Sequence, residues 1–240
     1  MPPISQCAGY RSEEDKFLLL TSKLGNNDLN IIYKILLEEF GPQYWWPAET
    51  RFEVIVGAFL TQQTKWSNVE KAIQNLKQAG MLEPHKLAKA DIKSLEEMIR
   101  CCGFYRQKAD RLKKVAHFFT ENDMDELFKL PTEELRKVLL SIHGVGNETA
   151  DSIILYAANK PKFVIDAYTT RIMDCIGIKG NYRQLQNLFE MMLPHEVTLF
   201  KEYHALIVEY AKVYCGKKRC NECILLNVSR KGTIHGQKQV

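Results

Sequence analysis

The chain has 240 residues, of which 45% are hydrophobic and 26% charged, and its formal net charge is +4 at pH 7. This is an ordinary globular composition, which argues against a disordered or collagen-like chain. The longest apolar segment, 52–60, is interrupted by Glu53 and Gly57, whereas a membrane-spanning helix needs about 20 apolar residues. Charged residues in 11–16 interrupt the region where a signal peptide would be apolar, so we expect a cytoplasmic protein without a membrane partner.

Helical periodicity predicts an all-α fold. Apolar residues in 28–40 recur every three or four positions, and the pattern ends at Gly41-Pro42. The same periodicity predicts helices over 52–63, 69–78, 92–101, 107–120, 131–140, 149–158, 168–175, 184–192 and 199–213. Residues 163–165 read as extended, and three residues do not make a sheet.

The segment 142–147, Ile-His-Gly-Val-Gly-Asn, joins two predicted helices as a tight hairpin. Gly144 and Gly146 have no side chain and can take positive φ, so backbone N–H groups can approach an anion closely. The following helix adds unpaired amides and the positive end of its dipole, which together favour a phosphate. Such a turn would hold a nucleic-acid backbone without reading its sequence. A purely structural glycine turn is the alternative.

Several motifs together resemble the endonuclease III superfamily of helix-hairpin-helix DNA glycosylases. In chain order these motifs are Trp45-Trp46-Pro47, residues 52–66, 103–109, 142–151 and 164–171. The double tryptophan and Glu148 most resemble the 3-methyladenine DNA glycosylase III branch. The resemblance implies two helical lobes with a cleft between them. One lobe would be a helical barrel over 47–159 with the helix-hairpin-helix at about 131–158, and the other would combine 1–46 with 160–240.

The resemblance implies that Asp166 is the catalytic carboxylate. Cleavage of an N-glycosidic bond builds positive charge on the sugar, which a carboxylate can stabilise while it orients the attacking water. Asp166 also precedes a predicted helix, where an N-cap is the structural alternative. Bifunctional members carry a lysine that forms a Schiff base at the position occupied here by Glu148. A carboxylate cannot form an imine, so we expect no lysine-dependent strand cleavage. Glu148 would assist water or touch the base, or it would only complement the helix dipole.

The tryptophans of the chain, Trp45, Trp46 and Trp66, all fall in family-like motifs. With Pro47, they would line the pocket that receives the extruded base. Indole faces attract cations, and N-alkylated purines carry or share positive charge. The alternative is that these tryptophans are large core residues with one edge at the surface.

The resemblance also assigns the DNA contacts. Gln62 matches the glutamine that related enzymes insert into the gap left by the base, although a polar residue after a buried helix is the alternative. Basic residues cluster in 100–114, where six Lys and Arg accompany one Asp; a solvated helix face is the other interpretation. The predicted contacts of the hairpin and this basic segment are His143, Gly144, Val145, Gly146, Asn147, Thr149, Lys108 and Arg111.

Seven cysteines include one spaced group, Cys215-x4-Cys220-x2-Cys223. Many superfamily members hold a [4Fe–4S] cluster near this position, and four thiolates are the usual requirement. No fourth cysteine follows here, so we expect a remnant that binds no metal, and no cofactor required for catalysis. A cluster or zinc site completed by His204 or His235 is the alternative.

The sequence therefore predicts a monomeric, monofunctional DNA glycosylase. It would release alkylated purines of the 3-methyladenine or 7-methylguanine type from damaged double-stranded DNA and leave the abasic site to an AP endonuclease. A related glycosylase for uracil, mismatched thymine or oxidised bases is the nearest alternative. A non-catalytic helix-hairpin-helix DNA-binding protein is the alternative of another class.

Overall fold

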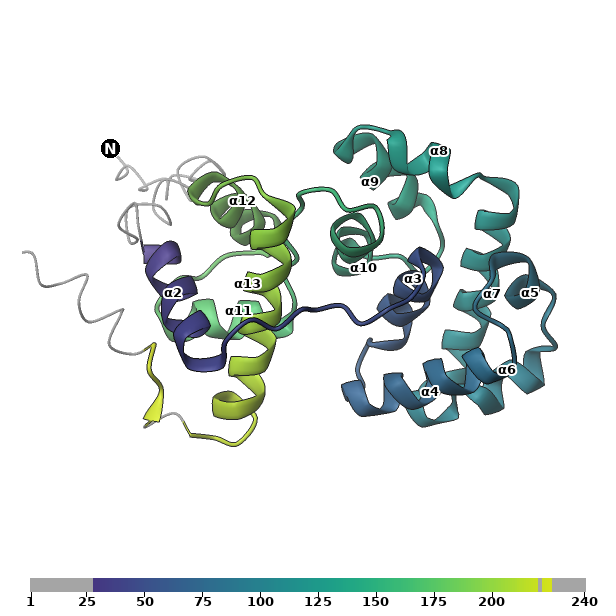
Figure 1. Cartoon of the computed structure of the whole chain (residues 1–240), viewed down its shortest axis with the longest axis horizontal. Helices are drawn as coiled ribbons and strands as arrows, with labels where there is room; N and C mark the ends of the chain where they lie inside the picture. Colours follow the sequence, from purple (N-terminus) through teal and green to yellow (C-terminus); the bar gives the residue numbers. More distant parts are fainter. Residues whose placement is uncertain (1–27, 220–221, 226–240) are drawn as a thin grey trace, which may run out of the picture. The chain divides into compact units, whose positions relative to one another are not determined.

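The computed structural model describes residues 28–219 and 222–225 (Figure 1). These residues form helices, turns and loops without strands. The all-α prediction is confirmed. The helices are α2 (Asp28–Phe40), α3 (Arg51–Leu60), α4 (Trp66–Gln78), α5 (Pro84–Lys89), α6 (Ile92–Met98), α7 (Tyr105–Glu121), α8 (Met124–Lys129), α9 (Thr132–Ser141), α10 (Asn147–Ser152), α11 (Ala167–Cys175), α12 (Tyr182–Met192) and α13 (Val197–Tyr210).

Most predicted helices occur with shifted ends. The predicted helix 92–101 is divided into α6 and a 3-10 turn, Arg100–Cys102. The predicted helices 149–158 and 199–213 each finish in a π-helical turn, Ile153–Ala157 and Ala211–Cys215. The periodicity missed α5 and α8 because each has six residues, too few to repeat an apolar pattern.

The chain divides into two compact units. The first unit takes the described parts of 1–41, 165–194 and 206–240, and the second takes 42–164 and 195–205. In the first unit, Leu29, Ile32 and Leu36 form the buried stripe of α2. Phe40, at the end of that helix, packs edge-on against Tyr210 and Tyr214.

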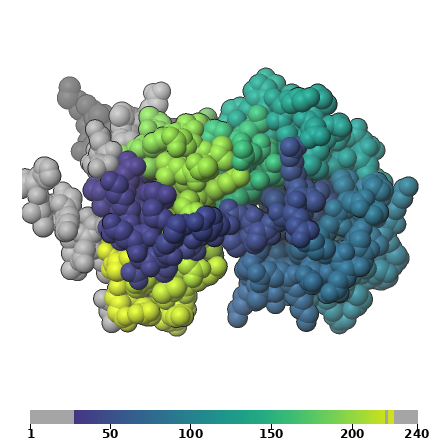
Figure 2. Space-filling model, viewed as in Figure 1, coloured from purple at the N-terminus to yellow at the C-terminus, as the bar shows by residue number. Residues whose placement is uncertain are grey.

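The second unit is built around α3. All of its residues except Arg51 are buried, and its neighbours are α4, α7, α10 and the π-helical turn that follows α10 (Figure 1). Thr50 begins the helix because its side chain accepts a hydrogen bond from the Glu53 N–H. In the space-filling view, the blue and teal surface belongs to this unit (Figure 2). The candidate site residues that follow α3 therefore start from a fixed, buried helix.

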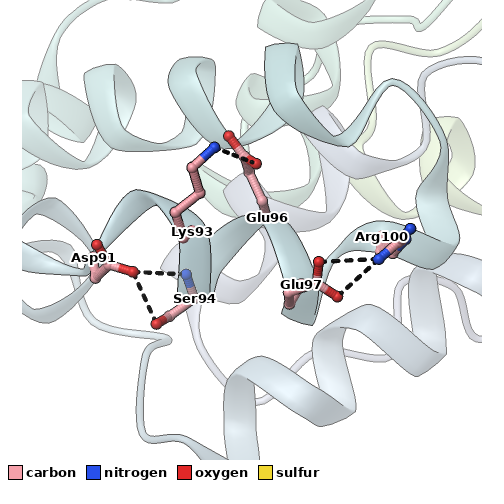
Figure 3. A network of polar contacts seen from close by, with 6 residues as sticks. All are labelled: Asp91, Lys93, Ser94, Glu96, Glu97 and Arg100. Carbon is pink, nitrogen blue, oxygen red and sulfur yellow. Dashed lines mark hydrogen bonds and ion pairs between the residues drawn. The ribbon is translucent and has the colours of Figure 1, made fainter.

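The surface of α6 shows how one short helix is bounded (Figure 3). Asp91 is its N-cap and accepts hydrogen bonds from the Ser94 N–H at 2.8 Å and from its hydroxyl at 3.0 Å. Lys93 pairs with Glu96 at 3.6 Å. After the helix, Arg100 donates to Glu97 at 3.0 Å. Arg100, the first residue of the basic segment, is thus already paired on the surface, where such pairs contribute little to stability.

Candidate functional site

The hairpin joins α9 to α10 as predicted, with a different conformation at its two glycines. Gly144 has φ +89°, so it occupies the left-handed region. Gly146 has φ −96° and ψ 179°, an extended conformation, and it is the N-cap residue of α10. The expectation of positive φ is therefore correct for Gly144 alone. The Val145 N–H donates to the Ile142 carbonyl at 3.0 Å, and Val145 is buried, whereas His143 and Gly146 are exposed.

A buried ion pair ties the two helices of the hairpin together. Arg136 of α9 donates from Nε to Asp151 Oδ1 at 2.7 Å and from Nη2 to Oδ2 at 3.1 Å. Asp151 of α10 is 0% exposed, and the fork geometry of this pair makes it a strong interaction. The same Nη2 donates to the Asn147 side chain at 2.9 Å. Asn147, predicted to contact DNA, is thus also part of the hairpin's internal support.

Gln62 lies just beyond the end of α3 and bridges two other predicted DNA-binding residues. Its Oε1 accepts a hydrogen bond from Arg111 Nη1 at 2.9 Å, and its Nε2 donates to Thr149 Oγ1 at 3.1 Å. The aliphatic part of Arg111 lies against Gly144, where an added Cβ would be 2.8 Å from Arg111 Cδ. The structure therefore brings Gln62, Arg111, Thr149 and the hairpin together. Thr149 is 5% exposed, so the hydroxyl that accepts the hydrogen bond from Gln62 is buried.

Lys108 has a role inside the fold, in contrast to the predicted DNA contact. It is 3% exposed, and its Nζ donates at 2.9 Å both to the Leu60 carbonyl and to the Cys102 carbonyl. Burial lowers the pKa of the Lys108 ammonium. Leu60 and Cys102 end α3 and the 3-10 turn, and a cation at helix C-termini satisfies their free carbonyls. The positive charge of Lys108 therefore supports the start of the segment that carries Gln62.

The predicted base-pocket tryptophans form one group, here termed the indole cluster: Trp45, Trp46 and Trp66. The ring centroids of Trp45 and Trp66 are 4.2 Å apart, and those of Trp46 and Trp66 are 5.4 Å apart with rings 88° to each other. The Trp45–Trp46 peptide bond is cis. All three side chains are half-buried, and Pro47 beside them is exposed. The cluster thus has both an anchored side and a side that solvent reaches.

Two neighbours fix Trp46 on its buried side. An added Cβ at Gly57 of α3 would be 2.8 Å from Trp46 Cζ2, so the indole lies directly on the helix backbone. Tyr156 packs against Trp46 with ring centroids 5.3 Å apart. The Tyr156 hydroxyl is 2.7 Å from His204 Nδ1, and both residues are buried. The sequence did not indicate these contacts of Gly57 and Tyr156, because each joins residues that only the folded chain brings together.

Asp166 is the N-cap of α11 and belongs to the first unit. Its Oδ1 accepts hydrogen bonds from the Thr169 N–H at 2.7 Å and from the Thr169 hydroxyl at 2.8 Å. The capping alternative is therefore realised in the structure. These hydrogen bonds are compatible with a catalytic role, because they hold the carboxylate in one orientation.

Glu148 lies in the first turn of α10 and is exposed. This position complements the positive end of the helix dipole. The electrostatic interpretation fits this position, and a role of Glu148 towards water or the base stays a prediction.

The family resemblance implies a metal cluster at the C-terminal cysteines. Cys215 and Cys223 line an apolar cavity of the first unit, and Cys220 lies outside the described residues. Cys223 Sγ is 2.6 Å from the Tyr210 hydroxyl, and burial, followed by this contact, raises the pKa of Tyr210. The residues that line the cavity are Ile172, Cys175, Ile176, Tyr210, Tyr214, Cys215, Cys223 and Leu225. Within the described part of the chain, no group of three or more potential ligands is arranged to hold a metal ion. A [4Fe–4S] cluster needs four thiolates, and because Cys220 lies outside the described residues, the expected loss of the metal stays a prediction.

Phe104 is a further candidate for DNA contact that the sequence did not indicate. It is 62% exposed, has φ +46° and precedes α7. The guanidinium groups of Arg100 and Arg106 lie 5.7 Å and 5.8 Å from the centre of the adjacent Tyr105 ring. A nucleic-acid base can stack on a large exposed aromatic such as Phe104, and the cations over the neighbouring Tyr105 ring would attract nucleic-acid phosphates.

None of the described helices is long and apolar enough to cross a membrane.

Comparisons with known proteins match most of the chain. A family model described as the HhH-GPD superfamily of base excision DNA repair proteins matches residues 56–194. A Methanocaldococcus jannaschii protein, provisionally named a DNA repair glycosylase, is 51% identical over 200 residues, which cover 80% of this chain and 91% of that protein. Endonuclease III of Thermotoga maritima is 28% identical over 73% of this chain and 81% of its own length.

Solved structures agree with these matches. The H. pylori 3-methyladenine DNA glycosylase bound to 1,N6-ethenoadenine superposes with a TM-score of 0.67 and 31% identity, over 82% of this chain and 97% of that one. A non-covalent endonuclease III–DNA complex superposes with a TM-score of 0.73 and 21% identity, over 87% and 97% of the two chains. At that identity the second match shows the shared fold.

Proposed function

Because the chain belongs to the HhH-GPD superfamily of base excision DNA repair proteins, we propose that it is a monofunctional DNA glycosylase that releases alkylated purines. The indole cluster carries this proposal. Three half-buried indoles within 4.2 to 5.4 Å of one another offer ring faces on which a flat, cationic base can stack. The H. pylori relative is a 3-methyladenine glycosylase seen with a modified adenine, which supports the same substrate class.

The proposed reaction needs few groups. An N-alkylated purine is already a good leaving group, because its positive charge weakens the glycosidic bond. The Asp166 carboxylate then stabilises the positive charge that develops on the sugar and orients the attacking water. The hairpin amides hold a backbone phosphate on the same strand, which fixes the nucleotide during the reaction.

The proposed reaction stops at the abasic site. A lyase needs an amine that attacks the sugar, and the position that carries this amine in bifunctional relatives is Glu148. The product would therefore require an AP endonuclease for strand cleavage. Treatment with borohydride during the reaction tests this point, since a covalent protein–DNA adduct would reveal an amine at work and overturn the monofunctional assignment.

The experiment for the substrate class is base release from a panel of duplexes. The panel contains 3-methyladenine, 7-methylguanine, uracil, mismatched thymine and 8-oxoguanine, each scored with and without alkali. We expect release of the methylated purines, with strand breaks only after alkali. Release of another base instead would reject the alkylpurine assignment, and release of none would favour a non-catalytic DNA-binding protein.

A further inference from the structure

We propose that Arg111 and Thr149 are positioning residues that hold Gln62 in one orientation relative to the hairpin. This inference rests on the proposed function and on the prediction that Gln62 enters the gap left by the extruded base. A glutamine on a loop samples many rotamers. Here both ends of its side-chain amide are engaged, the oxygen with Arg111 at 2.9 Å and the nitrogen with Thr149 at 3.1 Å.

The two partners of Gln62 are themselves fixed. Thr149 is 5% exposed within the first turn of α10, so its hydroxyl cannot swing away into solvent. The Arg111 side chain lies across Gly144, which has φ +89° and would place a Cβ 2.8 Å from Cδ and 2.9 Å from Cγ of Arg111. Glycine at this position therefore allows both the turn and the close passage of Arg111.

The result is a continuous series of contacts from the turn at Gly144, through Arg111, to the glutamine. Gln62 follows α3, Arg111 belongs to α7, and Thr149 and Gly144 belong to the hairpin segment. A DNA strand bound by the hairpin would thus contact Gln62 in a fixed position and orientation. Arg111 also brings a positive charge next to the hairpin, which favours the binding of DNA of any sequence.

A stopped-flow experiment separates positioning from lesion choice. The duplex carries a tetrahydrofuran abasic analogue with 2-aminopurine on the opposite strand, so that the fluorescence change reports insertion without any base release. We expect Thr149→Val and Arg111→Lys each to slow insertion about tenfold when the protein is at saturating concentration. Thr120→Val is the matched control, because Thr120 of α7 bonds only the local His117 carbonyl among the described residues, and it should insert at the wild-type rate.

A double-mutant cycle shows whether the partners act through Gln62. If they do, Gln62→Ala combined with Thr149→Val is no slower than Gln62→Ala alone, within about twofold. The proposal would be overturned if the double variant were slower by the product of the two single effects. An unchanged insertion rate in both Thr149→Val and Arg111→Lys would also overturn it. Should Thr149→Val fail to fold, Arg111→Lys takes its place in the cycle. Normal insertion at the abasic analogue together with no release of methylated purines would reject the proposed substrate and keep this inference.

Discussion

The hairpin holds its shape through charge and backbone conformation, whereas the indole cluster holds its shape through ring contacts. In the hairpin, the Arg136–Asp151 pair joins the two helices and Gly144 supplies the positive φ. In the indole cluster, Trp46 lies on Gly57 and against Tyr156. Both regions belong to the second unit and adjoin α3 or α10.

This difference corresponds to two tasks in base excision. Backbone amides at a helix N-terminus attract any phosphate, so the hairpin suits a contact that is the same along the whole DNA. Ring faces respond to the shape and charge of a base, so the indole cluster suits a choice between bases. The comparison predicts that variants in the hairpin alter DNA affinity and that variants in the indole cluster alter selectivity.

The largest expected effect comes from Asp166, which lies in neither region. Asp166→Asn should lower base release about 10²- to 10³-fold, because the stabilising charge is lost. Asparagine is as good an N-cap as aspartate, so the thermal midpoint and the DNA affinity should change little. Single-turnover release and a binding titration measure both quantities. An equal loss of binding and release would reduce Asp166 to a structural cap.

Removal of Arg136 tests the charge that supports the hairpin. Arg136→Met should lower the free energy of unfolding by about 3 to 5 kcal/mol, because Asp151 would remain buried without its guanidinium partner. Urea unfolding followed by circular dichroism measures the change. The exposed Arg100→Met should cost far less, since Arg100 pairs with Glu97 at the surface. Similar losses in the two variants would contradict the assigned importance of the buried pair.

A side chain at Gly57 tests the contact between Trp46 of the indole cluster and the backbone of α3. Gly57→Ala should push Trp46 from its position and destabilise the second unit by about 1 to 3 kcal/mol, because the new Cβ meets the indole at 2.8 Å. We expect the emission of the tryptophans to shift and release of methylated purines to fall while the Kd for undamaged DNA stays the same. Unchanged tryptophan emission would show that Trp46 does not rest on this helix.

The two glycines of the hairpin form a matched pair. Gly144→Ala should cost about 1 to 2 kcal/mol and weaken DNA binding, because its φ is +89° and the Cβ would displace Arg111. Gly146→Ala should change stability by less than about 0.5 kcal/mol, since its φ is negative and no atom lies within 4 Å of the added carbon. Thermal melts compare them directly. Equal destabilisation would refute the difference assigned to their conformations.

The sequence predicted the fold class and the hairpin well, since both depend on local patterns. Helical periodicity and a glycine turn are readable over a few residues, and the motifs carried the family resemblance. The contact between Gln62 and Thr149 joins residues 87 positions apart, so no local pattern could reveal it. Lys108 illustrates the same limit, because a basic segment shows charge but not which of its members the fold buries.

Phe104 and Tyr156 were missed for a related reason. Their importance depends on exposure and on neighbours, which only the folded chain defines. Cys220 and the residues beyond 225 lie outside the described part of the chain, so the predicted metal ligands remain a prediction there.

The central claim is that the hairpin binds the DNA backbone and the indole cluster selects the base. Measuring two quantities for each of two variants tests it most directly. The ratio of 3-methyladenine release to uracil release and the Kd for undamaged duplex are measured for Trp66→Leu and for Gly144→Ala. We expect Trp66→Leu to change the release ratio about tenfold or more and to leave the Kd for undamaged duplex unchanged. We expect Gly144→Ala to raise that Kd and to leave the release ratio unchanged. This division of tasks would be contradicted if Gly144→Ala changed the release ratio, or if Trp66→Leu changed only the Kd for undamaged duplex.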